Sequence, residues 1–179
     1  MTPVGIPEGL NGRVLSSLNR LLYQDFELLK LDAHEQALSS KLASYLQQDF
    51  PSHHVDCEYN KHSKGLKFTG SDKKEKESRP DIVVHDRGND QRNLLVIEIK
   101  KFGSSNLANK KAIKKLREFT HTHMPDYHHY GYEYGLFLCF DVTTGLTLEW
   151  YSNGVRVGDS ISYRARQDEN NLRNYFLVE

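Results

Sequence analysis

Residues 79–101 read RPDIVVHDRGNDQRNLLVIEIKK, and this stretch decides which fold we expect. Two aliphatic runs, 82–84 and 94–99, flank a polar segment that contains a glycine. Aliphatic and β-branched runs of this length are typical of strands, and the polar segment between them predicts a hairpin. We place the centre of its turn between Asn89 and Asp90.

Three charged side chains come together on this hairpin. The turn centre sets Asp81 opposite Glu98, to within one or two residues of register. Side chains alternate along a strand, so Glu98 and Lys100 project from the same face. Carboxylates held this close raise each other's pKa unless a cation neutralises them, and such oxygen ligands suit Mg²⁺ or Mn²⁺. The sequence therefore predicts a metal site here.

The pair Pro80-Asp81, followed by Glu98-Ile99-Lys100 at the end of the next hydrophobic strand, resembles the PD-(D/E)XK nuclease superfamily. The fold of that superfamily is also called restriction endonuclease-like. The motif is short, and its context carries the resemblance: an aliphatic strand, a hairpin and a helix on either side. That context covers roughly residues 32–140.

The resemblance implies a set of site residues. In this family the Asp and the Glu bind the catalytic metal, which here means Asp81 and Glu98 with Mg²⁺ or Mn²⁺. The carbonyl of Ile99 is implied as a further ligand, and Lys100 is implied to assist the attacking water. Many members add a Glu from the preceding helix, and Glu35 matches that position. The implied activity is hydrolysis of phosphodiester bonds, with a DNA endonuclease as the first expectation.

Two glutamates have both a functional and a structural interpretation. Glu35 falls on the apolar face of a helix expected over about 33–48, where an inward carboxylate needs a partner. Asp32 and Glu35 are also spaced as the two ends of a capping box, which would engage Glu35 at the helix terminus instead. Glu58, in a strand expected over 55–59, reaches the metal site only if its face is the inner one. A solvated strand face explains it equally well.

Charge is balanced over the chain but unevenly distributed. The 24 basic and 24 acidic residues argue against a general polyanion binder. Residues 61–79 nevertheless hold seven basic and three acidic residues, and residues 100–117 hold seven basic and no acidic ones. A basic surface around a metal centre suits a phosphodiester substrate, although lysine-rich loops and helix faces are often simply solvated. The expected nucleic-acid contacts are Lys61, Lys64, Lys101, Lys110 and Lys114.

Helical periodicity and punctuation predict the elements around the motif. Residues 1–12 are expected to form an irregular arm, followed by a helix of about ten residues from Arg13. The polar residues 60–78 are typical of a mobile surface loop. A further helix over 107–119 follows an N-cap supplied by 103–106, with its lysines along the exposed side.

Strand patterns complete the fold. Residues 132–141 form an apolar run typical of a buried strand, and 146–151 with 155–157 predict a hairpin with an Asn-Gly type I′ turn. Residues 158–179 are expected to form a polar tail whose final residues, 175–178, dock on the domain. The order predicts an α/β, restriction endonuclease-like fold: an α-β-β-β-α-β core, a central mixed sheet flanked by helices, and an extra C-terminal β-hairpin.

The length fits one nuclease-like domain over 13–179, with its core at about 32–141 and the hairpin and tail over 142–179. No run of about 18 apolar residues occurs, and the N-terminus lacks the features of a signal peptide. We therefore expect a cytoplasmic protein without a membrane partner. No DNA-reading motif is visible, so a homodimer and a subunit of a larger complex both fit the sequence.

Two other interpretations of the motif stay open. The chain would be a catalytically silent protein that binds nucleic acid or assembles a complex if it kept the fold without the chemistry. A scaffold, however, has no physical need for converging carboxylates beside a lysine. The motif would be a coincidence if the carboxylates formed ordinary salt bridges with Lys100 and Arg79. Whether Asp81 and Glu98 share one face of the sheet decides the last question.

Overall fold

The motif hairpin supplies two inner strands of a mixed sheet. The strands of this sheet are β1 (His54–Cys57), β6 (Ile82–His85), β7 (Leu95–Lys101), β8 (Tyr134–Asp141), β9 (Gly145–Ser152), β10 (Val155–Asp168) and β11 (Asn171–Val178). They lie in the order β1-β6-β7-β8-β9-β10-β11. Strands β7 and β8 are parallel, and all other neighbours are antiparallel. This computed structural model describes residues 3–62, 65–66, 68–69, 76–121, 130–141, 145–168 and 171–178.

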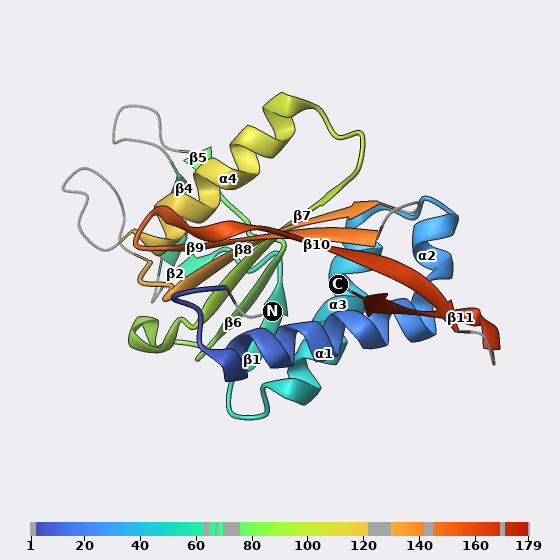
Figure 1. The fold of residues 1–179 in the computed structure, drawn as a ribbon. Helices are drawn as coiled ribbons and strands as arrows, with labels where there is room; N and C mark the ends of the chain where they lie inside the picture. The colour runs from blue at the N-terminus through green and yellow to red at the C-terminus, as the bar shows by residue number, and fades with distance from the viewer. Residues whose placement is uncertain are drawn as a thin grey trace.

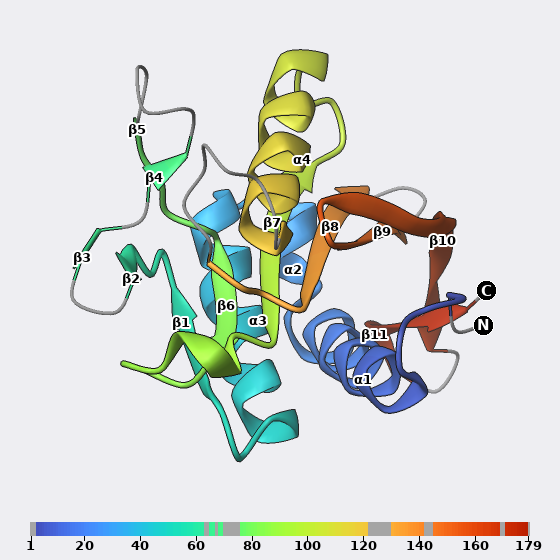
Figure 2. The same ribbon diagram turned by 90° about the vertical axis from the view of Figure 1, so that its left-hand side faces the viewer.

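Helices cover both faces of the sheet (Figures 1 and 2). They are α1 (Glu8–Asp25), the short α2 (Glu27–Lys30), α3 (Glu35–Asp49) and α4 (Asn106–Thr120). Ile82 and Ile97 share one buried cluster with the leucines of α1 and α3, whereas Val83 and Val96 share another with Leu116 of α4. Side chains alternate along a strand, so the face that carries Val96 also carries Glu98. The motif carboxylate therefore lies on the α4 side of the sheet.

The register of the hairpin agrees with the sequence prediction. Ile82 pairs with Ile97 and Val83 with Val96. The next residues outward, Asp81 and Glu98, are therefore opposite each other. The connection is more elaborate than a simple turn, because a 3-10 helix over Asp90–Arg92 precedes β7.

The order α3-β1-β6-β7-α4-β8 reproduces the predicted α-β-β-β-α-β sequence, within an α/β architecture whose mixed sheet is flanked by helices. The parallel pairing across α4 is also as expected, with Glu98 beside Phe137. Helix α4 begins where predicted, since the hydroxyl of its N-cap Ser105 accepts the Ala108 N–H at 3.1 Å. No helix in the described part of the chain is long and apolar enough to cross a membrane.

The predicted irregular arm is too long. Helix α1 begins at Glu8, so 8–12 are helical, and the helix is 18 residues long rather than about ten. Leu10 is buried with Val14, which extends the apolar stripe of the helix by one turn. Glycine costs a helix interior about 1 kcal/mol relative to alanine, and burial of a leucine offsets such a cost. Glycine content was therefore the wrong signal here.

The predicted polar tail is also wrong. Strand β10 continues to Asp168, and β11 pairs with its second half. Figures 1 and 2 show β11 lying beside α1. Tyr163 of β10 is buried and pairs with Leu146 of β9, so β10 has the alternation of a strand with one solvated face. The expected C-terminal hairpin is thus a three-stranded β9-β10-β11 unit.

The predicted loop over 60–78 contains two small ladders in its described residues. They join β2 (Lys61–His62) to β3 (Gly65–Leu66) and β4 (Phe68–Thr69) to β5 (Lys76–Glu77). Lys64, one of the predicted nucleic-acid contacts, lies outside the described residues. Strand β1 ends at Cys57, so Glu58 follows the strand and has a positive φ of 49°.

Candidate active site

Asp81 is anchored to the motif strand by its carboxylate. Its Oδ2 accepts the backbone N–H of Ile99 at 2.6 Å, and its carbonyl accepts the N–H of Glu58 at 3.2 Å. Burial raises the pKa of Asp81, and the hydrogen bond from Ile99 opposes that shift without cancelling it. The carboxylate is therefore fixed at the point where β6 begins, one strand away from Glu98.

Glu98 is the most deeply buried charged residue of the motif. It is only 2% exposed, and its Oε1 lies 2.7 Å from the ammonium of Lys115. Burial raises the pKa of Glu98 to about 8, and the negative charge of Asp81 acts in the same direction. Lys115 acts in the opposite direction. Ionisation of Glu98 at this buried position thus costs free energy, and a nearby cation would reduce that cost.

Lys115 was missed as a site residue. We predicted it on the exposed side of α4, but it is half-buried and also donates to the carbonyl of Arg79 at 3.1 Å. The spacing held a usable signal. Lys115 lies three residues after the buried Ala112 and four before the buried Phe119, so it falls on the stripe that faces the sheet.

Lys100 connects the motif to α3. Its ammonium donates to Oε2 of Glu35 at 2.8 Å and to the carbonyl of Ile99 at 2.7 Å. Burial by itself lowers the pKa of Lys100, but the hydrogen bond with Glu35 and the charges of Asp81 and Glu98 outweigh it, so the pKa is raised overall. Lys100 therefore keeps its positive charge at neutral pH.

The capping-box interpretation of Glu35 is wrong. The N-cap of α3 is His34, whose Nδ1 accepts the N–H of Gln36 at 3.3 Å, and Glu35 is the first residue of the helix. Asp32 instead accepts a hydrogen bond from Lys101 at 2.6 Å. Glu35 is left to face Lys100, as the inward interpretation requires.

The charged cluster of the motif consists of Asp81, Glu98, Lys100, Lys115 and Glu35. Glu58 and Lys101 lie beside this cluster, and both have structural contacts of their own. Oε1 of Glu58 accepts from the side-chain amide of Gln36 at 2.5 Å. Besides its bond to Asp32, the ammonium of Lys101 donates to the carbonyl of Ala33 at 3.1 Å. Lys101 thus fastens the segment before α3 to the end of β7, and its contact with nucleic acid stays a prediction.

Three other predicted nucleic-acid contacts lie on the surface of the described part of the chain. Lys61 and Lys110 are exposed, on β2 and α4 respectively. The ammonium of Lys114 lies 3.5 Å from Oε1 of Glu118, one turn further along α4. None of these positions contradicts a contact with a phosphate backbone, and none establishes one.

The cluster places carboxylates next to ammonium groups, and its oxygen atoms are ligands that suit a hard divalent cation. Within the part of the chain that the structure describes, no group of three or more His, Cys, Asp or Glu side chains is placed to hold a metal. Mg²⁺ does not require one, because it is usually bound by one or two carboxylates together with water and substrate phosphates. Asp81, Glu98 and the Ile99 carbonyl supply oxygen donors of that kind. The residues present therefore fit Mg²⁺ or Mn²⁺.

Comparison with known proteins adds no relative. No family model, curated protein or solved structure matches the chain.

Proposed function

We propose that the chain is a divalent-metal-dependent nuclease of the PD-(D/E)XK type, with the restriction endonuclease-like fold, and that its substrate is DNA cut internally. One observation carries the proposal. Asp81 and the buried Glu98 are opposite each other on neighbouring strands, with the ammonium groups of Lys100 and Lys115 beside them. Buried carboxylates facing each other destabilise a fold unless cations compensate them, and this is the usual sign of a functional site.

The motif residues would hold the metal. Asp81, Glu98 and the carbonyl of Ile99 are its proposed ligands, with Glu35 as an outer or second-metal ligand. A divalent cation bound there supplies Lewis-acid polarisation of the phosphate and lowers the pKa of water. The basic residues around the cluster, including those on α4, would position the phosphate backbone of the substrate.

Lys100 acts as a fixed positive charge in this proposal. A lysine serves as a general base only when its pKa is lowered towards neutrality, whereas the pKa of Lys100 is raised. Its hydrogen bond to Glu35 limits the orientations of the ammonium group. An ammonium held in place stabilises negative charge that develops on a phosphate during attack, without reorganising at that moment.

A second candidate function is a catalytically silent protein that binds nucleic acid or assembles a complex. One observation favours it: both lysines of the cluster already lie against carboxylates. A cluster balanced in this way would be structural. It would bind no metal, and its replacement would alter stability rather than activity.

Cleavage of a mixed substrate set separates the two functions. Supercoiled plasmid, linear duplex, single-stranded DNA, branched DNA and RNA would be incubated with Mg²⁺ or Mn²⁺ and wild type, Asp81→Ala or Lys100→Ala. Asp86→Ala is the matched control, because Asp86 lies at the opposite end of the same hairpin and pairs with Arg92 at 3.1 Å.

We expect metal-dependent cleavage by the wild type and the control, and none by the other two variants. The substrate that is cut identifies the class of nucleic acid. Absence of cleavage together with absence of Mn²⁺ binding by calorimetry would refute the enzymatic function and leave the silent protein.

A further inference from the structure

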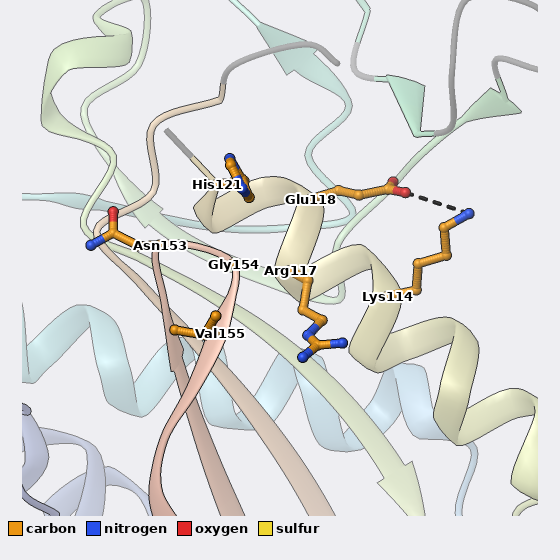
Figure 3. Close-up of a pocket in the computed structure, with 7 residues that line it drawn as sticks. All are labelled: Lys114, Arg117, Glu118, His121, Asn153, Gly154 and Val155. Atoms are coloured by element: carbon orange, nitrogen blue, oxygen red, sulfur yellow. Dashed lines mark ion pairs between the residues drawn. The ribbon is translucent and has the colours of Figure 1, made fainter. Parts of the chain in front are cut away.

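A cavity of about 370 Å³ lies between the end of α4 and the turn that joins β9 to β10 (Figure 3). Helix α4 contributes Lys114, Arg117 and Glu118 to its wall, and His121 follows the helix. The carboxylate of Glu118 is largely buried and paired with Lys114. With the exposed guanidinium of Arg117, the wall carries a net positive charge, which favours an anionic ligand.

The opposite wall is held in place by backbone geometry. Asn153 and Gly154 both have positive φ, 50° and 75°, as a type I′ turn requires. The N–H of Gly154 donates to the hydroxyl of Thr120 at 3.2 Å, which fixes the turn to the end of α4. A Cβ at residue 154 would lie 2.5 Å from Cδ2 of His121, so the imidazole packs where only glycine leaves room. The cavity is therefore preformed.

The lining chemistry matches a nucleotide. The volume is near the lower end of the range for ligand sites, which suits a ligand of that size. Arg117 is well suited to bind a phosphate, since its guanidinium donates two parallel hydrogen bonds. Val155, 55% exposed, and the ring of His121 offer surfaces for a base to stack against.

Helix α4 connects this cavity to the proposed active site. Lys115 contacts Glu98, and its neighbour Lys114 lines the cavity. His121 lies six residues after Lys115, which is about 9 Å along a helix axis. A nucleic-acid strand that follows α4 would therefore pass both the cavity and the lysine that contacts Glu98.

We infer that this cavity binds one nucleotide of a nucleic-acid strand, on the same helix as the lysine that contacts Glu98 at the bond that is cut. Its position relative to that bond rests on the proposed function, whereas nucleotide binding does not. Arg117 holds the phosphate, and Val155 and His121 hold the base. The cavity thus fixes the path of the strand along α4.

Binding measured without a divalent cation tests this inference. Fluorescence polarisation in EDTA would compare labelled single-stranded oligonucleotides of two to twelve nucleotides with nucleoside 5′-monophosphates and inorganic phosphate as competitors. The variants are Arg117→Ala, which removes the phosphate contact, and Val155→Trp, which fills the cavity from an exposed position. Arg156→Ala is the matched control: it removes a neighbouring positive charge that does not line the cavity.

We expect Arg117→Ala and Val155→Trp to weaken oligonucleotide binding by about tenfold or more, and the control to change it by less than about twofold. Arg117→Ala should also reduce the slope of log K against log salt by about 0.7, the value for one phosphate contact on a single strand. Affinity should increase with strand length.

Three results would overturn the inference: equal binding by Arg117→Ala and Arg156→Ala, competition by inorganic phosphate as strong as by nucleotides, or no gain with strand length. The last would assign the cavity to a free nucleotide. Failure of the nuclease is separately visible. If no substrate is cut but binding still depends on Arg117, the nucleotide-binding inference holds without the nuclease activity. If cleavage depends on Asp81 but Arg117→Ala binds normally, the nuclease activity holds without the nucleotide-binding inference.

Discussion

Glu98→Gln removes the titratable carboxyl group at the centre of the cluster while keeping the shape of the side chain. The ordinary pKa of a glutamate is 4.5, and burial raises that of Glu98 to about 8. Since the folded-state pKa is the higher one, the folded protein takes up a proton that the unfolded chain releases between these values. The stabilisation from this proton is complete below pH 4.5 and is lost as pH rises to about 8.

The expected size follows from that shift. Each unit of pKa corresponds to about 1.4 kcal/mol, so at pH 7 the wild type has lost roughly 3 kcal/mol relative to pH 4.5 through Glu98 alone. Glutamine does not titrate, and its variant escapes this loss. The difference in unfolding free energy between Glu98→Gln and wild type should therefore grow by roughly 2 to 3 kcal/mol from pH 4.5 to pH 7.

Urea denaturation at several pH values, in EDTA, measures this difference directly. Glu133→Gln is the control, because it makes the same change of side chain at an exposed position. A flat difference for Glu98→Gln would show that Glu98 titrates normally. The argument that a costly buried carboxylate is kept for a cation would then fail.

Two other predictions concern contacts outside the cluster. Asp56 bonds to Arg87 and His85, and the hydrogen bond from Arg87 is the main cause that lowers the pKa of Asp56 below 3.8. The stabilisation that ionised Asp56 gives the fold is therefore present above pH 3.8 and is lost as the pH falls below that value. Asp56→Asn should therefore cost about 1 to 2 kcal/mol at pH 7 and little at pH 2, and an equal loss at both pH values in urea denaturation would contradict this. Gly154→Ala should lower the free energy of unfolding by about 1 to 2 kcal/mol, and the thermal midpoint with it. Alanine does not readily adopt a φ of 75°, and its Cβ would collide with His121. Gly12→Ala should instead raise the thermal midpoint, because Gly12 lies in a helix and has open space around it. An equal change of the midpoint in both variants would contradict backbone strain at residue 154.

The register of the motif hairpin was predictable because it depends on local chemistry. Two aliphatic runs and a polar connection are enough to set Asp81 opposite Glu98, and alternation then fixes which side chains share a face. The Asn-Gly turn and the N-cap at Ser105 were predictable for the same reason. Each is specified within a few neighbouring residues.

The features that the sequence did not predict depend on contacts between distant segments. Lys115 lies on the buried stripe of α4, but a lysine ordinarily indicates solvent, and only the presence of Glu98 beneath it makes burial favourable. The strands after residue 157 are polar on one side, and pairing with β9 is what identifies them. His34 is the N-cap of α3 in place of the expected Asp32, whose carboxylate accepts a hydrogen bond from Lys101. No local pattern announces such a partner.

The consecutive lysines at the end of β7 have a mechanical consequence. Lys100 holds Glu35, and Lys101 holds Asp32 and the carbonyl of Ala33. Two adjacent residues of one strand thus clamp both sides of the point where α3 begins. A cation that draws Glu35 away from Lys100 would therefore act on the start of α3, whose leucines share a buried cluster with those of α1.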